Sequence, residues 1–491
     1  MKISKLWDFI EVLDVKGDPE AEVTGVSYDS REVKPGHLFV CVEGFNWDGH
    51  DFAEQALQNG ARVLMVQREI PVAGPGVTVI RVKDSRKAMA AVGHVFYDFP
   101  SQKLKVIGVT GTNGKTTTTY LIKSVLESAG HSVGLMGTIA IRIGDKEIPA
   151  LRTTPESLDL HRLFAEMVED GIQYAVMEVS SHSLDLDRVG YVDFDYGIFT
   201  NLTRDHLDFH GNMKNYLDAK IKLFKSTDKF NIINADDPSS DTILERIKNS
   251  PTPAVTYGIK TGADFSARDI QLDPTGVKYN LAWKGKNIPI EVRIPGIISV
   301  YNSLAAAAAL LCEGISPEHV QRGLKEVEGV RGRSETIDTG KGFSVIIDYA
   351  HTPDGLENIL STIRGYAKGR IITLFGCGGN RDREKRPMMG EIAGRLSDFV
   401  IITSDNPRKE EPHQIIDEIL PGVEKTGCSY ICIVDRREAI EYALEMAGKD
   451  DIVVLAGKGH EIYQEFADHK IEFDERKIVA EILERMGNDQ A

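Results

Sequence analysis

Apolar runs that end in polar residues alternate along the chain with segments of helical period. In the first hundred residues, strands are predicted at VTGVSYDSR, HLFVCVEG and ARVLMVQ, with a helix from about 51 to 60 before the third. The segment 98–104, DFPSQKL, has a proline and no apolar period, which is typical of a linker. The alternation of strand and helix signals predicts an α/β fold.

The middle of the chain carries three apolar runs, YAVMEV, YGIFTN and FNIIN, that each end in a polar cluster. Ligands of open α/β sheets bind beyond the carboxyl ends of the strands, so these clusters should line one crevice. The clusters contain Glu178, Ser180, Ser181, His182, Asn201, Thr203, Asp205, His206, Asn234 and Asp236.

Two later segments predict a small antiparallel patch. VTYG around Tyr257 and the alternating VKYNLAWKGKNIPIEVRI are interpreted as hairpin strands. An alanine-rich helix follows PGIIS, and Asn302 near its predicted start would either cap the helix or contact a nucleotide.

The C-terminal third alternates regularly, with strands predicted in FSVIID, RIITLF, DFVIIT, YICIV and DIVVLA and helical patterns between them. This pattern predicts a doubly wound, Rossmann-like parallel sheet. With 491 residues, the chain has room for about three domains. We place them at 1–100, 101–335 and 336–491, as a small α/β domain, a central phosphate-loop ATPase-type domain and the Rossmann-like domain.

Composition narrows the function. The net charge of -16 argues against general binding to nucleic acid or to an anionic membrane. Five cysteines without metal-ligand spacing predict reduced thiols in a cytoplasmic protein. Asp8 and Glu11 interrupt what would have to be an apolar core in residues 1–15, which therefore do not form a secretory signal. The longest apolar run, 304–312, is too short to span a bilayer.

The stretch VIGVTGTNGKTTTTYLIKSVLESAG predicts strand, phosphate loop and helix. Gly111 and Gly114 would let backbone N–H groups face phosphate oxygens, Lys115 would reach the terminal phosphates, and the Thr116 hydroxyl would ligate Mg²⁺. The usual pattern has a glycine where this chain has Val109. Binding of a nucleoside triphosphate is the leading interpretation, and a plain glycine-rich turn is the alternative.

Among the polar clusters, Glu178 is the natural Mg²⁺ ligand, because a carboxylate ends a strand opposite a phosphate loop. The alternative is an exposed strand end. His206 stays open between a ligand and a structural histidine. GCGG at 376–379 has the wrong spacing for a nicotinamide cofactor, and the basic RDREKRP at 381–387 is either an anion site or a solvated helix start.

Ten motifs spread over nearly the whole chain resemble the Mur ligases: GVTGTNGKTTT, TTPESLDL, MEVSSHSLDLDRV, FTNLTRDHLDFHG, YLDAK, NADD, DYAHTPD, FGCGGNRDREKRP, TSDNPRKEEP and AGKGHEIYQ. Within that family they are most similar to the enzymes that add meso-diaminopimelate to UDP-N-acetylmuramoyl-L-alanyl-D-glutamate in peptidoglycan synthesis. The resemblance implies three domains, ATP as co-substrate, two Mg²⁺ ions, and an acyl phosphate that the incoming amine attacks. Asn380 stands where the family usually has aspartate, and Arg331 where proline is usual.

The resemblance also assigns residues. Glu178, His206, Thr116 and Lys220 resemble metal ligands, with Lys220 as a carbamate; from the sequence alone Lys220 would be a solvated helix lysine. The nucleotide contacts would be Gly111, Thr112, Asn113, Gly114, Lys115, Thr116, Thr117, Asn302, Arg333 and Asp348. The UDP-sugar dipeptide would meet Tyr28, Ser30, Phe45, Asn46, Trp47, Thr153, Thr154, Ser180 and Arg188. The diaminopimelate contacts would be Arg381, Asp405, Asn406, Pro407, Arg408, Gly457 and Glu461.

Diaminopimelate differs from lysine by a distal carboxylate, and a guanidinium pairs with a carboxylate through two hydrogen bonds. On this interpretation Arg408, with Arg381 nearby, binds that carboxylate, and lysine would leave Arg408 unpaired. Glu461 would bind the distal ammonium. The alternatives are a lysine-adding relative, a folate-type polyglutamate ligase, and a switch protein that only hydrolyses nucleotide. We expect a monomer without nucleic-acid or membrane partners.

Overall fold

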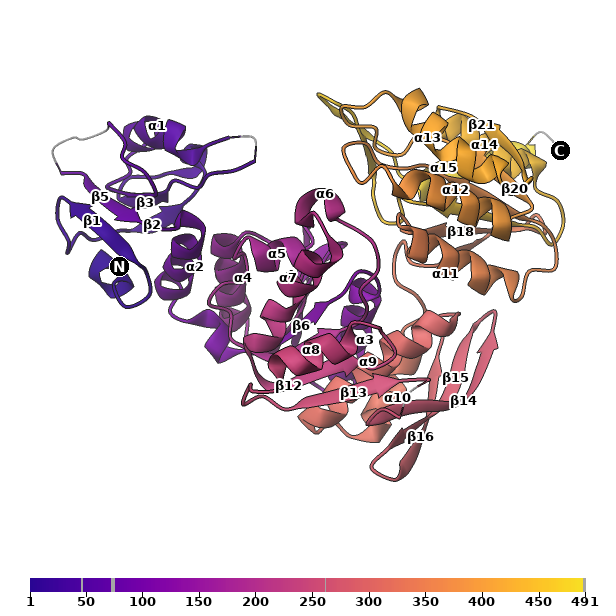
Figure 1. Ribbon diagram of the computed structural model, residues 1–491, viewed down its shortest axis with the longest axis horizontal. Helices are drawn as coiled ribbons and strands as arrows, with labels where there is room; N and C mark the ends of the chain where they lie inside the picture. The colour runs from indigo at the N-terminus through magenta and orange to yellow at the C-terminus, as the bar shows by residue number, and fades with distance from the viewer. Residues whose placement is uncertain (46, 72–75, 261, 489–491) are drawn as a thin grey trace.

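The computed structural model describes residues 1–45, 47–71, 76–260 and 262–488, which form three main β-sheets with helices packed against them. Figure 1 shows the three sheets in chain order along the molecule, with the magenta central sheet between the N-terminal and C-terminal ones. The predicted α/β class with a C-terminal parallel sheet is confirmed. The exact domain boundaries stay a prediction.

The N-terminal sheet has five strands in the order β1-β5-β4-β3-β2, parallel except for β1. The three predicted strands are present as β2, β3 and β4, whereas β1, β5 and α2 were not predicted. The helix predicted from about 51 is a 3-10 turn followed by α1. The bounds are β1 Val12–Lys16, β2 Gly25–Ser27, β3 His37–Val40, α1 Ala53–Gln58, β4 Val63–Val66, β5 Thr78–Val82 and α2 Ser85–Phe96. The predicted linker contains a 3-10 turn, Pro100–Lys103.

The central sheet has eleven strands in the order β16-β15-β14-β13-β12-β11-β6-β10-β7-β8-β9. Its middle strands are parallel, and β6 lies between β10 and β11. Strands β14, β15 and β16 form the predicted antiparallel patch. The prediction that VTYG belongs to a hairpin is wrong, because β13 pairs in parallel with both β12 and β14. A second antiparallel patch, β7-β8-β9, was not predicted.

The strands of this sheet are β6 Lys105–Thr110, β7 Val133–Met136, β8 Ala140–Ile143, β9 Lys146–Pro149, β10 Tyr174–Glu178, β11 Phe194–Phe199, β12 Thr227–Asn234, β13 Ala254–Gly258, β14 Phe265–Asp273, β15 Gly276–Trp283 and β16 Lys286–Val292. The helices of this part are α3 Lys115–Ser128, α4 Ser157–Glu169, α5 Ser181–Asp185, α6 Leu207–His210, α7 Met213–Lys225, α8 Ser240–Ile247, α9 Ile297–Glu313 and α10 Pro317–Glu326.

The C-terminal sheet has the order β17-β18-β22-β19-β20-β21, with β18 to β22 all parallel and β17 antiparallel at the edge. The five predicted strands are therefore confirmed. A two-stranded hairpin, β23-β24, was not predicted. The bounds are β17 Glu335–Asp338, β18 Ser344–Asp348, α11 Pro353–Arg364, β19 Ile371–Phe375, α12 Lys385–Leu396, β20 Phe399–Ile402, α13 Pro412–Glu424, β21 Ser429–Cys432, α14 Arg436–Met446, β22 Ile452–Ala456, β23 Tyr463–Glu465, β24 Lys470–Glu472 and α15 Glu475–Asn488.

Four residues separate the end of β6 from the start of helix α3, whose apolar residues face the core. Leu121, Ile122, Val125 and Leu126 are fully buried, as the helical stripe predicted. Gly130 has a φ of 86°, which suits the left-handed turn after a helix. On the described part of the chain, no helix is both long enough and apolar enough to cross a membrane.

Candidate functional site

The phosphate loop lies between the end of β6 and the start of α3, and the segment after β11 holds its shape. Asn113 N–H donates to Asn201 Oδ1 at 2.9 Å, and a Cβ at Gly111 would overlap Thr200 Oγ1. Lys115 Nζ donates to Gly111 O and Thr112 O at 2.9 Å, so its ammonium is folded over the loop. The polar residues after β11 thus meet the phosphate loop, as the strand-end pattern predicts.

A cavity of about 110 Å³ opens between the central and C-terminal sheets beside the phosphate loop. Six of its lining residues are among the predicted nucleotide contacts: Asn113, Gly114, Thr117, Asn302, Arg333 and Asp348. Arg333 Nη2 donates to Thr116 Oγ1 at 3.1 Å. Burial raises the pKa of Asp348, and its carboxylate accepts from Ser334 N at 2.6 Å.

Asn302 does not cap its helix. Helix α9 begins at Ile297, after Gly296, so Asn302 is more than one turn inside the helix and is buried. A Cβ at Gly114 would lie 2.5 Å from Asn302 Oδ1, which shows how closely the helix approaches the loop. The cap alternative is therefore wrong, and contact with a nucleotide stays a prediction.

The predicted metal ligands come from three elements near the phosphate loop. Glu178 ends β10 and is buried, and its two carboxylate oxygens accept from Thr138 N at 2.8 Å and Thr138 Oγ1 at 3.0 Å. Burial lowers the pKa of His206 to about 3, so its imidazole is neutral, the form that binds metals. The described residues contain no group of three His, Cys, Asp or Glu side chains arranged for a metal. One carboxylate and one imidazole alone would leave a Mg²⁺ short of oxygen ligands.

Lys220 is fully buried on α7, which contradicts the solvated lysine that the sequence alone suggests. Its Nζ lies 4.5 Å from the centre of the Tyr216 ring, and among the described residues no carboxylate lies within ion-pair distance of it. Burial, and then the charge of Lys115, lower its pKa well below the usual value. The side chain is thus a buried amine whose charged form is disfavoured.

Asp205 is a site residue whose role sequence patterns did not specify. Burial alone would raise its pKa, but the hydrogen bond from His351 and the charge of Lys385 hold the pKa well below its usual value. His206 Nε2 lies 3.3 Å from its carboxylate and His351 Nε2 3.8 Å. Because His351 comes from the C-terminal part, Asp205 joins the two parts at the predicted metal site.

A second, larger cavity of about 720 Å³ lies between the N-terminal sheet and α4. Tyr28, Ser30 and Trp47 of the predicted UDP-sugar contacts line it. Phe45 does not line it; its ring packs 6.0 Å from the ring of Phe209 in the central part. Asn46 lies outside the described residues.

Three arginines surround one buried carboxylate at this cavity. Glu156 has Arg188 Nε at 3.1 Å, Arg152 Nη1 at 3.2 Å and Arg86 Nη1 at 3.7 Å. Only Arg188 of these was predicted, because no local pattern indicates that distant arginines converge. The remaining predicted contacts, Thr153, Thr154 and Ser180, lie beside Glu178: Thr154 Oγ1 donates to Glu178 O at 2.8 Å, Ser180 N donates to Thr154 Oγ1, and Thr153 Oγ1 lies 3.1 Å from Thr138 Oγ1.

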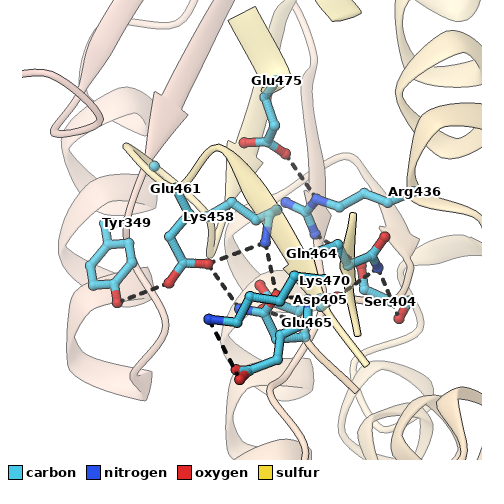
Figure 2. Close-up of polar contacts among 12 residues, drawn as sticks. Tyr349, Ser404, Asp405, Arg436, Lys458, Glu461, Gln464, Glu465, Lys470 and Glu475 are labelled. Atoms are coloured by element: carbon cyan, nitrogen blue, oxygen red, sulfur yellow. Dashed lines mark hydrogen bonds and ion pairs between the residues drawn. The ribbon is translucent and has the colours of Figure 1, made fainter. Parts of the chain in front are cut away.

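The predicted amino-acid contacts gather at the carboxyl end of the C-terminal sheet (Figure 2). Glu461 Oε2 accepts from Asn406 Nδ2 at 2.8 Å and from Lys458 Nζ at 3.2 Å, and Tyr349 OH points to its other oxygen. A Cβ at Gly457 would lie 2.7 Å from Asp405 Oδ2. Burial opposes ionisation of Asp405, but Lys458 and Arg436 keep its pKa below the usual value. These groups form one cluster of paired charges, the predicted amino-acid site.

Arg408 has a partner in its own chain, which corrects one expectation. Its Nε donates to Glu465 Oε2 at 2.9 Å and its Nη1 to Gly379 O at 2.9 Å. Lysine in the pocket would therefore leave Arg408 paired with Glu465. Arg381 is exposed nearby and donates to Asn380 O at 3.1 Å.

The basic segment 381–387 is not a solvated helix start throughout. Arg386 is fully buried and donates to both Glu410 and Glu418, while Asp382 pairs with Arg204 of the central part at 2.9 Å. Of the two unusual residues, Asn380 has a φ of 53° and accepts from Lys409 N, and Arg331 lies 3.6 Å from Asp474. Asparagine suits that left-handed backbone.

The fold and the site together define a three-part α/β protein with a phosphate loop at the carboxyl edge of its central sheet. Three family models match it: the Mur ligase family catalytic domain at residues 22–97, the Mur ligase middle domain at 109–310 and the Mur ligase glutamate ligase domain at 332–459. The chain belongs to the Mur ligase family, whose members are ATP-dependent, ADP-forming amide ligases that use Mg²⁺.

Similar proteins cover the whole chain. A Clostridium acetobutylicum protein named UDP-N-acetylmuramoyl-L-alanyl-D-glutamate--2,6-diaminopimelate ligase 1 is 49% identical over 99% of this chain and 100% of its own length. A Caldanaerobacter subterraneus ligase of that name, without the number, is 50% identical over 96% of both chains. A solved ligase structure of the same description is 32% identical, with a TM-score of 0.69 over 99% of both chains. MurF from Acinetobacter baumannii, 20% identical with a TM-score of 0.70 over 98% of both chains, shares the fold.

Proposed function

We propose that this chain is the ATP-dependent ligase that joins meso-diaminopimelate to the D-glutamate side chain of UDP-N-acetylmuramoyl-L-alanyl-D-glutamate in peptidoglycan synthesis. Whole-chain similarity to ligases of that name supports this activity. The structural observation that carries it is the position of Glu178. Its carboxylate accepts a hydrogen bond from Thr138 and its carbonyl oxygen accepts one from Thr154, beside the predicted dipeptide contacts. Its strand β10 pairs with β6, which leads into the phosphate loop.

In the proposed reaction, the γ-phosphoryl group of ATP passes to the D-glutamate side-chain carboxylate, and ADP leaves. The amine of diaminopimelate then attacks the acyl carbon, the amide bond forms, phosphate departs and the amine gives up a proton. Lys115 would hold the phosphates, and the residues around Glu178 would hold the carboxylate in line with them. Bound Mg²⁺ would neutralise the crowded anions.

The residue roles are part of the proposal. Thr116, Glu178 and His206 would hold Mg²⁺, as part of a two-ion site that ATP phosphates complete, and Lys220 would serve as a carbamate. The burial of Lys220 and its lowered pKa support this role, because a neutral amine is the form that adds CO₂. The carbamate would add two oxygens where the described carboxylates and imidazoles are too few.

Lys220→Ala should lower kcat by about 100-fold, and acetate or propionate should restore part of it. The matched control is Lys222→Ala on the same helix, because Lys222 is half-exposed and pairs with Asp185. The Mg²⁺ concentration that gives half-maximal activity should rise in Lys220→Ala and stay unchanged in Lys222→Ala. Unchanged activity in Lys220→Ala would exclude the lysine from metal binding.

The experiment that tests the activity is a product mass measurement with UDP-N-acetylmuramoyl-dipeptide, ATP and an equal mixture of diaminopimelate and lysine. A product with diaminopimelate mass supports the proposal, and a lysine product favours the lysine-adding relative. Phosphate release with ATP alone would indicate a switch protein, and a glutamate product with folate would indicate a polyglutamate ligase. We also propose that the enzyme acts as a cytoplasmic monomer, which its mass by light scattering tests.

A further inference from the structure

Arg408 and Glu465 form a partly exposed ion pair beside the predicted amino-acid site. Glu465 is the last residue of β23, and Arg408 N–H donates to its carbonyl oxygen at 3.1 Å, so the backbone keeps the two residues together. Arg408 Nε donates to Glu465 Oε2 at 2.9 Å. The two side chains are 23% and 29% exposed, so a small solute reaches the pair without unfolding the pocket.

The guanidinium of Arg408 is therefore already occupied on the edge that a second carboxylate would use. Its Nη1 donates to Gly379 O at 2.9 Å, and its Nε is bound to Glu465. A carboxylate that pairs with two guanidinium nitrogens through the Nε side must take the position of Glu465.

Lys470 is already a second cationic partner of the Glu465 carboxylate. Its Nζ lies 3.7 Å from Glu465 Oε1 and 4.2 Å from the centre of the Tyr463 ring, and Figure 2 shows Glu465 and Lys470 joined in this way. Lys470 comes from β24, the strand paired with β23. Rotation of Glu465 away from Arg408 would thus leave its carboxylate paired with Lys470.

We propose that Glu465 is an exchangeable counter-ion that holds Arg408 until the distal carboxylate of the incoming diamino acid displaces it onto Lys470. This inference rests on the proposed function. It makes Glu465 a specificity-determining residue: it competes with the distal carboxylate and so weakens binding of diaminopimelate. It also keeps Arg408 paired when lysine enters, which reduces the penalty against lysine.

The test is Glu465→Gln, which keeps the shape and removes the charge. The KM for diaminopimelate should fall about fivefold, while kcat and the KM values for ATP and the UDP-sugar dipeptide stay unchanged. The preference for diaminopimelate over lysine, as the ratio of kcat/KM values, should rise by at least the same factor. The matched control is Glu472→Gln, an exposed glutamate of β24 that pairs with Lys477 at 2.7 Å; it should change none of these values.

A KM for diaminopimelate that is unchanged or higher in Glu465→Gln would overturn the proposal, because Glu465 would then not compete or would bind the substrate itself. In an Arg408→Ala background, Glu465→Gln should lose its effect, and a retained fivefold effect would also overturn it. Lys470→Gln is the second variant if the Glu465→Gln change disturbs folding: it should raise the KM for diaminopimelate about threefold and leave lysine unchanged, and no rise would contradict the exchange. Absence of any diaminopimelate product from the wild-type enzyme would instead refute the proposed function.

Discussion

The two predicted substrate sites, one beside the N-terminal sheet and one at the C-terminal sheet, differ in how their charges are paired. Beside the N-terminal sheet, Arg86, Arg152 and Arg188 surround the single carboxylate of Glu156, so positive charge is in excess. Burial and the neighbouring arginines lower the pKa of Arg188 against the opposing effect of Glu156. At the C-terminal site, by contrast, three cations each pair with a carboxylate: Lys458 with Glu461, Arg436 with Glu475, and Arg408 with Glu465.

The difference corresponds to the chemistry of the proposed substrates. A UDP-sugar brings a diphosphate with two negative charges, and an arginine cluster with excess charge gains partners when that group binds. A diamino acid carries both ammonium and carboxylate groups. A site of paired charges therefore distinguishes amino acids by the positions of their charged groups and not by their net charge. The first site should therefore determine the affinity for the UDP-sugar dipeptide, and the second should determine which amino acid is added.

Arg152→Gln should weaken binding of the UDP-sugar dipeptide at the first site, and this is the largest effect that we expect. The KM for the UDP-sugar dipeptide should rise about 10- to 50-fold, the range for a lost hydrogen bond to a charged group, with kcat and the KM for diaminopimelate unchanged. The steady-state kinetics of all three substrates measure this. Arg162→Gln is the control, since Arg162 pairs with Glu166 on α4. An equal effect of Arg152→Gln on diaminopimelate would contradict the separation of the two pockets.

Glu156→Gln should act in the opposite direction. Without the carboxylate, the cluster of three arginines has a higher net positive charge and attracts the diphosphate more strongly. The KM for the UDP-sugar dipeptide should therefore fall about fivefold. The free enzyme should melt at a lower temperature, because a buried carboxylate that compensates arginines is lost. Titration calorimetry with the UDP-sugar dipeptide checks the sign. Weaker binding would mean that Glu156 itself contacts the ligand and that the excess charge is not used.

Mild acid should lower the stability of the contact between His161 and Gly190 near the first site. It should not change the ionisation of Asp405 in the second site. Burial lowers the pKa of His161 to about 4; its Nε2 lies 3.1 Å from Gly190 O, and its Nδ1 is buried without a partner. A histidine with a lowered folded-state pKa stabilises the protein above its unfolded pKa of about 6.5, and this stability is lost as the pH falls toward 4. At pH 6 the loss from His161 is about 0.8 kcal/mol.

Melting curves at pH 7.5 and 6 test this sign. His161→Gln keeps a donor for Gly190 O and removes the titration, so its melting temperature should depend less on pH than that of the wild type. His469→Gln, in the exposed turn between β23 and β24, should keep the wild-type pH dependence. Asp405 should stay ionised at pH 6, because its pKa lies below the usual value. An equal pH dependence in wild type and His161→Gln would contradict the prediction.

The parts of the fold that were predicted are those with a strong local period. Buried parallel strands such as β6 and β18 are continuous apolar runs, and α3 carries one apolar stripe. Two of the strands that were not predicted, β9 and β24, are short and largely exposed, so their sequences lack such a run. The direction of β13 also escaped prediction, because parallel and antiparallel neighbours do not differ in a single strand's pattern.

The sequence by itself determined the phosphate loop, the strand-end clusters and the family to which the chain belongs. A glycine turn, a lysine and a strand end are local features, so they can be recognised from the order of neighbouring residues in the sequence. Only the tertiary structure decided that Lys220 is buried and that Asn302 lies within its helix. It also decided that three arginines converge on Glu156 and that Glu465 pairs with Arg408. Burial and ion pairing depend on which distant segments pack together, and a local pattern holds no record of such partners.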